Sequence, residues 1–207
     1  MMKKLLPILL AVLLLTCLLC ACGDKGDDQP TNYDPADHKQ VAEKFLEAYF
    51  FRDYATRFSL MFYNYRQQWE DNAIKDTGSA EAFFATAQQQ ADNKGIEADI
   101  HSFDDYYAAY YQFIQADCRA MYGDYTFTIE ATESTQMDAA TFATFCDGLL
   151  GNIDEKYIDG AALRAVTEAH SVKVHLQIDG TLKDHSETYL VHLVRHDGRW
   201  LVASHSI

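Results

Sequence analysis

The spacing of apolar residues changes near Gly123, and this change limits the folds that the chain can adopt. Before Gly123, apolar and aromatic residues recur every three or four positions, as on one face of an α-helix. After Gly123, several runs alternate apolar and polar residues and end at Asp-Gly pairs, which is typical of antiparallel strands joined by tight turns. Helices followed by consecutive hairpins predict the α+β class.

Four helices are expected before the first strand. The first is amphipathic and carries Val41 on its apolar face, shortly after Pro35, a residue suited to a first helical turn. Ser79 is a suitable N-cap for the third helix, and Gly95 suits its end. The predicted helices are residues 41–52, 58–69, 79–93 and 103–121.

Four strands are expected after Gly123, with a further helix inserted between the first two. The pairs Asp179-Gly180 and Asp197-Gly198 are signals of two-residue hairpin turns. We therefore expect N-terminal helices packed on a curved antiparallel sheet of about four strands, with Trp200 at least half buried in the last strand. The predicted strands are residues 125–130, 172–178, 187–196 and 199–204, and the inserted helix is residues 137–153.

The first 22 residues have the layout of a secretory signal peptide. A positive start with Lys3 and Lys4 precedes a nearly unbroken apolar run, and the sequence becomes polar at Gly23. The run closes with Leu19-Cys20-Ala21-Cys22, which resembles the lipobox of bacterial lipoproteins. The resemblance implies that Cys22 becomes the lipidated first residue of the mature protein. It implies a location in the bacterial cell envelope, on the extracytoplasmic face of the membrane.

Other interpretations of this segment stay open. Cys17 and Cys20 are competing lipid sites, but bulky Leu19 precedes Cys20, and Thr16 precedes Cys17. A retained membrane helix is the other alternative, although an apolar run of about 15 residues is short for a bilayer that needs about 20. We expect residues 23–36 to be a flexible tether and residues 37–207 to form a single α+β domain.

The charge of the chain restricts its partners. The formal net charge is −14, and removal of the signal segment, which contains two Lys and no acid, makes it about −16. Phosphate groups repel such a chain, so we expect no nucleic-acid partner. Anionic headgroups repel it too, so the lipid at Cys22 must provide the membrane attachment. The charge also disfavours an anionic ligand, unless a local Arg cluster offsets it.

Both ends of the domain resemble a known superfamily. Residues 41–49 read VAEKFLEAY, and residues 191–202 read VHLVRHDGRWLV. These segments resemble the nuclear-transport-factor-two-like superfamily, also described as cystatin-like or ketosteroid-isomerase-like. The resemblance implies a cone-like domain whose mouth can hold a small molecule. Residues 70–121 are longer and more helical than in a minimal member. No residue here matches the Asp base or the Tyr–acid oxyanion site of the isomerase-like members, so no catalytic residue is assigned.

Aromatic residues crowd the predicted helix 103–121. Their helical spacing makes them core residues, but they occupy most of the circumference of the helix, which is more than one neighbour can bury. Because Tyr is stable when half hydrated, the surplus predicts a ligand pocket or a surface for a protein partner, and we expect the pocket between the aromatic helices and the sheet. The candidate pocket residues are Tyr106, Tyr107, Tyr110 and Tyr111.

Histidines in the last third offer a weak metal hypothesis. If Asp197-Gly198 forms a two-residue turn, His196 pairs with Arg199, His192 lies opposite Ala203 and His205 lies opposite Leu190. His192 and His205 are then diagonal neighbours on one face, within reach of a zinc ion. No Cys or acid at a fixed spacing completes the site, so ordinary surface or half-buried histidines are the alternative. We assign no metal or other cofactor.

Two cysteines lie in the predicted domain. An extracytoplasmic location permits a disulfide between Cys118 and Cys146, and two buried free thiols are the alternative. Because a strand separates the two predicted helices, we expect no disulfide.

Three functions are compatible with the sequence. We expect a membrane-anchored, non-catalytic domain that binds an unknown small molecule or protein. The alternatives are an enzyme with an isomerase-like apolar pocket and a purely structural domain.

Overall fold

The computed structural model describes residues 33–206. The predicted signal peptide, Cys22 and most of the tether lie outside the described residues. The helices are α2 (His38–Phe50), α3 (Tyr54–Leu60), α4 (Tyr65–Thr77), α5 (Ala80–Lys94), α6 (Phe103–Tyr122), α7 (Ala139–Asn152) and α8 (Gly160–Arg164). The strands are β1 (Tyr125–Gln136), β2 (Ala169–Gly180), β3 (His185–His196) and β4 (Arg199–Ser206).

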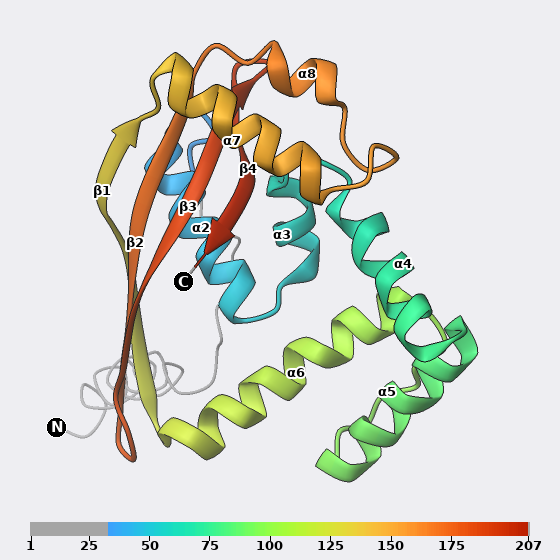
Figure 1. Ribbon diagram of the computed structural model, residues 1–207. Coiled ribbons are helices and arrows are strands. Elements are labelled where there is room, and N and C mark those ends of the chain that lie inside the picture. The colour runs from blue at the N-terminus through green and yellow to red at the C-terminus, as the bar shows by residue number, and fades with distance from the viewer. Residues whose placement is uncertain (1–32, 207) are drawn as a thin grey trace, which may run out of the picture. The chain divides into compact units, whose positions relative to one another are not determined.

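The strands form an open antiparallel sheet in the order β1-β2-β3-β4, and every strand pairs with the next one along the chain. The helix α2 crosses one face of the sheet, and α7 covers part of the other face (Figure 1). The predicted α+β class is confirmed, as is the helical insertion, since α7 and α8 lie between β1 and β2.

The alternation of side chains along the strands builds two cores. On one face, Val41, Phe45 and Leu46 of α2 pack against sheet residues that include Val174 and Val191. On the other face, α7 and α8 pack against the sheet residues Ala169, Val194 and Ala203. Because both faces of β4 are covered, residues 200–203 are buried without a break.

A third core lies among the helices α4, α5 and α6. Its centre is aromatic: the ring of Tyr106 lies 5.4 Å from Trp69 and 4.9 Å from Phe83, measured between ring centroids. Small residues of α5, Ala87 and Ala91, allow the helices to approach. In Figure 1, α4 and α5 lie side by side away from the sheet, and α6 runs from them back to the start of β1.

Short polar residues set where the helices begin. Each N-cap side chain accepts hydrogen bonds from backbone N–H groups of the first turn, which have no partner within the helix. The predicted cap Ser79 is confirmed. The N-caps are Asp37, Asp53, Asn64, Ser79, Ser102, Asp138 and Asp159.

The single helix predicted over residues 58–69 is wrong, because the chain interrupts it between α3 and α4. Met61 forms a parallel bridge with Val202, and the N–H of Phe62 donates to the Val202 carbonyl at 2.8 Å. Residues 61–62 therefore form backbone contacts with the edge of β4 that does not pair with β3. Asn64 then starts α4 by capping the N–H of Gln67.

Of the two expected turns, one is confirmed and one is displaced. Asp197 and Gly198 both have positive φ, as a tight hairpin turn requires. Asp179 and Gly180 instead remain in β2, and the turn follows them at residues 181–184. Gly180 pairs with Tyr125, and a Cβ at this position would lie 2.5 Å from the Tyr122 carbonyl oxygen, so the close approach requires glycine. The strand predicted at 125–130 also continues to Gln136.

Two further expectations are confirmed. Cys118 and Cys146 are buried free thiols, one on α6 and one on α7. Trp200 is 3% exposed.

Within residues 33–206, no helix is both long enough and apolar enough to cross a bilayer.

Trp200 links the last strand to the start of the domain. Its backbone N–H donates to the Pro35 carbonyl at 2.9 Å, and its indole N–H donates to the Ala36 carbonyl at 3.0 Å. We predict that Trp200→Ala lowers the free energy of unfolding by about 3–5 kcal/mol, because it leaves a cavity and removes the indole donor. Trp200→Phe keeps much of the packing and costs less. Urea denaturation measures both variants, and a loss below about 1 kcal/mol for Trp200→Ala contradicts this role.

Candidate functional site

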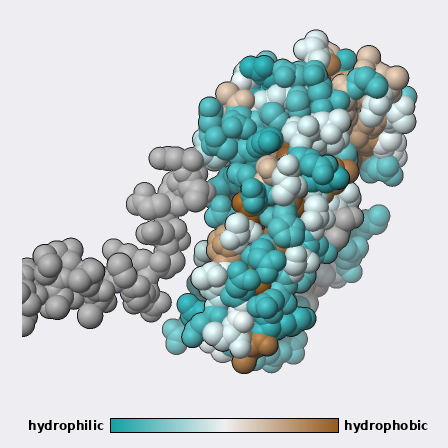
Figure 2. Space-filling view, turned by 90° about the vertical axis from the view of Figure 1, so that its left-hand side faces the viewer, coloured by the Kyte–Doolittle hydropathy of each residue, from teal (hydrophilic) through white to brown (hydrophobic). Residues whose placement is uncertain are grey.

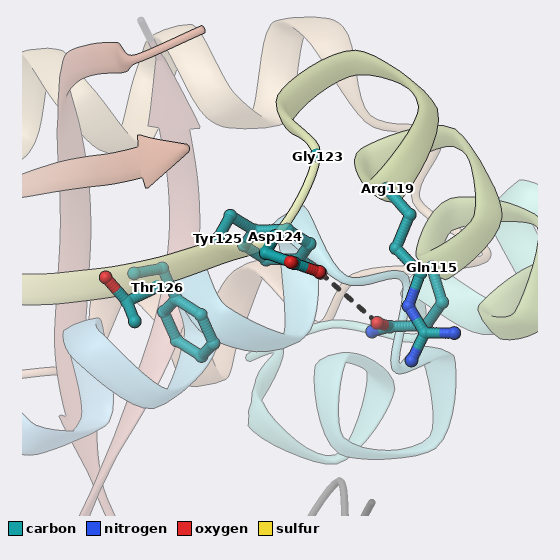
Figure 3. Close-up of a pocket in the computed structure, with 7 residues that line it drawn as sticks. Gln115, Arg119, Gly123, Asp124, Tyr125 and Thr126 are labelled. Carbon is teal, nitrogen blue, oxygen red and sulfur yellow. Dashed lines mark hydrogen bonds between the residues drawn. The ribbon is translucent and has the colours of Figure 1, made fainter. Parts of the chain in front are cut away.

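A groove separates the second half of α6 from the start of β1. Its cavity volume is about 540 Å³. Figure 3 shows side chains of α6 on one side of this cavity and residues of β1 on the other. The lining residues are Gln115, Arg119, Gly123, Asp124, Tyr125, Thr126 and Phe127.

The connection at Gly123 creates the groove. The helix α6 ends there with a φ of 75°, and the chain enters β1 two residues later. A Cβ at Gly123 would lie 2.2 Å from the hydroxyl oxygen of Thr181, so this tight reversal requires glycine. In Figure 1, α6 and β1 leave the connection between them in different directions.

The groove combines polar groups with one aromatic surface. The Tyr125 hydroxyl donates to Oε1 of Gln115 at 3.2 Å. Phe127 is 43% exposed, and its ring lies 4.5 Å from that of Phe51. Within residues 33–206, neither Arg119 nor Asp124 forms an ion pair. The groove therefore offers a cation, an anion, a hydroxyl group and an apolar ring to a ligand.

The Tyr125 hydroxyl stays protonated near neutral pH. Burial and the neighbouring Cys118 thiol raise the pKa of Tyr125 to about 12. The group can therefore donate or accept a hydrogen bond, but it cannot act as a base under these conditions.

The four predicted tyrosines occupy different places. Tyr106 is 7% exposed and belongs to the helical core, and Tyr107 and Tyr110 pack against the same core. The Tyr107 hydroxyl donates to Glu70 at 3.0 Å. These three residues do not line the groove. Tyr111 is 38% exposed and is an electrostatic neighbour of Tyr125, so it lies beside the groove. A binding role for the four tyrosines stays a prediction.

The polar residues of the groove were not predicted from the sequence. Tyr111, Gln115 and Arg119 are spaced by four residues, so they share one face of α6. This polar stripe was the available signal, but the aromatic residues of the opposite face obscured it.

The face of the molecule that carries β1 is mainly hydrophilic, with small separate apolar areas (Figure 2).

A second cavity, of about 810 Å³, lies between α7, α8 and β2. Its walls include apolar residues such as Met137, Phe142 and Cys146. Two of its charged groups are already engaged: Asp138 caps the N–H of Thr141, and Arg164 pairs with Asp147 at 2.9 Å. This cavity is larger than the groove, and Gln136 and Thr167 are further polar residues of its lining.

The predicted register of His192 and His205 is wrong. His196 does pair with Arg199, but the register shifts after Leu193, so that His192 pairs with Ser204 and His205 with Val191. The cause is a β-bulge, an extra residue that the turn signal does not reveal.

The bulge separates the two histidines. The His192 ring lies 5.1 Å from Phe145 of α7, whereas the His205 ring lies 5.1 Å from Phe45 of α2, so they occupy opposite faces of the sheet. Within residues 33–206, no group of three His, Cys, Asp or Glu side chains is arranged to hold a metal ion.

A histidine network joins α2 to the sheet and was not predicted. The Ser134 hydroxyl lies 2.8 Å from Nε2 of His38 and 2.9 Å from Nδ1 of His170. Both imidazole rings also contact Trp200. Burial, followed by the nearby His170, lowers the pKa of His38. The network therefore favours a neutral imidazole at His38 and ties the first turn of α2 to β1 and β2.

The chain matches no protein-family model, no curated protein and no solved structure. The fold stands as an α+β domain with N-terminal helices on a four-strand antiparallel sheet. The resemblance to the nuclear-transport-factor-two-like superfamily stays a prediction.

His205 makes the stability of the domain depend on pH. Burial, with a contribution from Arg57, lowers the pKa of His205 to about 4 from an ordinary value of 6.5. Between these values the unfolded chain binds more protons, so stability is lost as the pH falls from about 6.5 to about 4. We predict that His205→Asn removes roughly 2–3 kcal/mol of this pH-dependent loss.

Urea denaturation at pH 7 and pH 4 measures this difference. His101→Asn is a matched control at an exposed position and should keep the pH dependence of the wild-type chain. An equal loss of stability in the wild type and in His205→Asn contradicts the prediction.

Proposed function

We propose that the chain is a lipid-anchored extracytoplasmic binding domain whose ligand occupies the groove between α6 and β1. The observation that carries this proposal is the juxtaposition of Arg119, Asp124 and the Tyr125 hydroxyl around the exposed ring of Phe127. Small-molecule sites commonly combine an apolar surface with a few polar groups that fix orientation.

The chemistry of the groove favours an uncharged ligand with an apolar ring or chain. The ring of Phe127 offers an apolar contact, and the Tyr125–Gln115 hydrogen bond can be extended to a polar group of the ligand. Arg119 and Asp124 place opposite charges in the lining, so neither sign of net ligand charge is strongly favoured there. The formal charge of −14 further disfavours an anion in this open site.

Binding without catalysis is the function that the groove supports best. Its lining contains neither His nor Cys, and its hydroxyl group at Tyr125 remains protonated. Asp124 is the one carboxylate of the lining, and no His or Cys stands beside it there to complete an acid–base pair. A protein partner that inserts an apolar side chain beside Phe127 is compatible with the same groove.

The anchor of the proposed protein is the lipid at Cys22, and the sequence of the first 22 residues supports it. A diacylglycerol group provides two acyl chains, which suffice for stable attachment where one chain does not.

Native mass spectrometry tests the ligand site. We predict that protein purified from its own host carries a small molecule, and that Arg119→Ala and Phe127→Ala each reduce its occupancy about tenfold, as expected for a loss near 1.4 kcal/mol. Arg164→Ala, in the cavity beside α7, is the matched control and should retain the ligand. Retention in both groove variants, or loss only in the control, would contradict the proposed site.

Metabolic lipid labelling tests the anchor. Cys22→Ala should abolish the label, because the thioether requires the sulfur, whereas Cys118→Ala should keep it because Cys118 is buried in the domain. Continued labelling of Cys22→Ala would show that Cys17 or Cys20 carries the lipid, or that the assignment is wrong.

A further inference from the structure

Arg57 is a buried cation that forms no ion pair with an acidic side chain among residues 33–206. It lies on α3 and is 4% exposed. Its guanidinium carbon lies 4.6 Å from the ring centroid of Tyr49 and 4.6 Å from that of Tyr65. Its Nη2 donates to the Tyr65 hydroxyl at 2.5 Å. Its Nε is buried and has no hydrogen-bond partner among the described residues.

A second arginine joins the same cluster. The guanidinium carbon of Arg52 lies 5.4 Å from the Tyr49 ring centroid, and its Nε is also buried without a partner among residues 33–206. The His205 ring lies 4.6 Å from the Tyr49 ring, so β4 contributes to the cluster as well. The backbone of Arg52 has a φ of 60°, which is uncommon for a residue with a side chain.

Among the described residues, no ion pair balances the charges of this cluster. Neither Arg52 nor Arg57 forms an ion pair within residues 33–206. Buried charges are normally paired, because removing them from water is costly. The tyrosine rings stabilise the faces of the Arg57 guanidinium, but its N–H groups point outward in the plane of the group. Partly exposed Tyr63 and His205 lie nearby, so the cluster is close to the surface.

We propose that Arg57 and Arg52 form a binding site for a small oxyanion, such as the carboxylate or phosphate group of a small molecule. The planar guanidinium fork matches two oxygen atoms of such a group. The Tyr65 hydroxyl, which accepts a hydrogen bond from Arg57, and the His205 ring lie beside the Arg57 guanidinium. This site goes beyond the proposed function, because none of its residues lines the groove between α6 and β1. The chain has a formal net charge of −14, which repels anions, so an anion-binding site requires clustered Arg residues such as these.

Calorimetry and thermal unfolding of the full chain in detergent test the site. Sodium phosphate, sodium succinate and sodium acetate are titrated at low millimolar concentrations against sodium chloride, at constant ionic strength, so that general salt effects stay small. We expect one bound anion per chain. We expect a rise in Tm of roughly 3–6 °C at ten times the dissociation constant. A response to phosphate alone indicates a phosphate group, and a response to the organic acids indicates a carboxylate.

The variants Arg57→Met and Arg52→Met should each lose the anion response. Arg66→Met is the matched control, since Arg66 is a surface residue that pairs with Glu70 and Asp104. Arg119→Ala should also keep the response, which separates this site from the groove. Anion binding should in addition raise the pKa of His205 toward its ordinary value, as followed by nuclear magnetic resonance.

Two results would overturn the proposal. One is a wild-type chain whose Tm and calorimetric signal do not distinguish phosphate, succinate and acetate from chloride. The other is an unchanged anion response in both arginine variants. If Arg57→Met does not fold, the wild-type titration and Arg52→Met decide the question.

Discussion

The packing of α2 across the sheet determines where the other parts of the domain lie. Phe45 and Leu46 are fully buried against strand residues such as Val191 and Val202. Because α2 fills this face, the chain must leave it at Arg52 and continue along the edge of β4. That path places α3 beside the end of the sheet and brings Arg57 against Tyr49. It also leaves α4, α5 and α6 to form their own aromatic core, from which α6 returns to β1.

Much of the fold follows from local signals in the sequence. Alternating residues predicted the central parts of the strands, and the positive φ values at Asp197 and Gly198 agree with the expected tight turn. The break between α3 and α4 was not predictable from periodicity, because it depends on a bond from Phe62 to Val202, 140 positions along the chain. The extension of β2 through Gly180 likewise depends on its pairing with Tyr125. Long-range contacts therefore decide where regular patterns stop.

The candidate sites were harder to predict than the fold. Helical spacing correctly indicated crowded aromatic residues on α6, but it could not show that Tyr106 faces α4 and α5. The residues that line the groove, such as Arg119 and Phe127, come together only because Gly123 reverses the chain. The bulge at Ala203 moved His205 to the α2 face and away from His192. A bulge moves every later residue of the strand to the other face of the sheet. A difference of one residue in register therefore places His192 and His205 on opposite faces, where they cannot share a metal ion.

We propose that the groove between α6 and β1 is the ligand site of this domain. A crystal structure of the protein purified from its own host tests this proposal. We expect electron density for a small molecule in the groove, in contact with Arg119 and with the ring of Phe127. A groove filled only by solvent, with a bound molecule in the cavity beside α7, would contradict it.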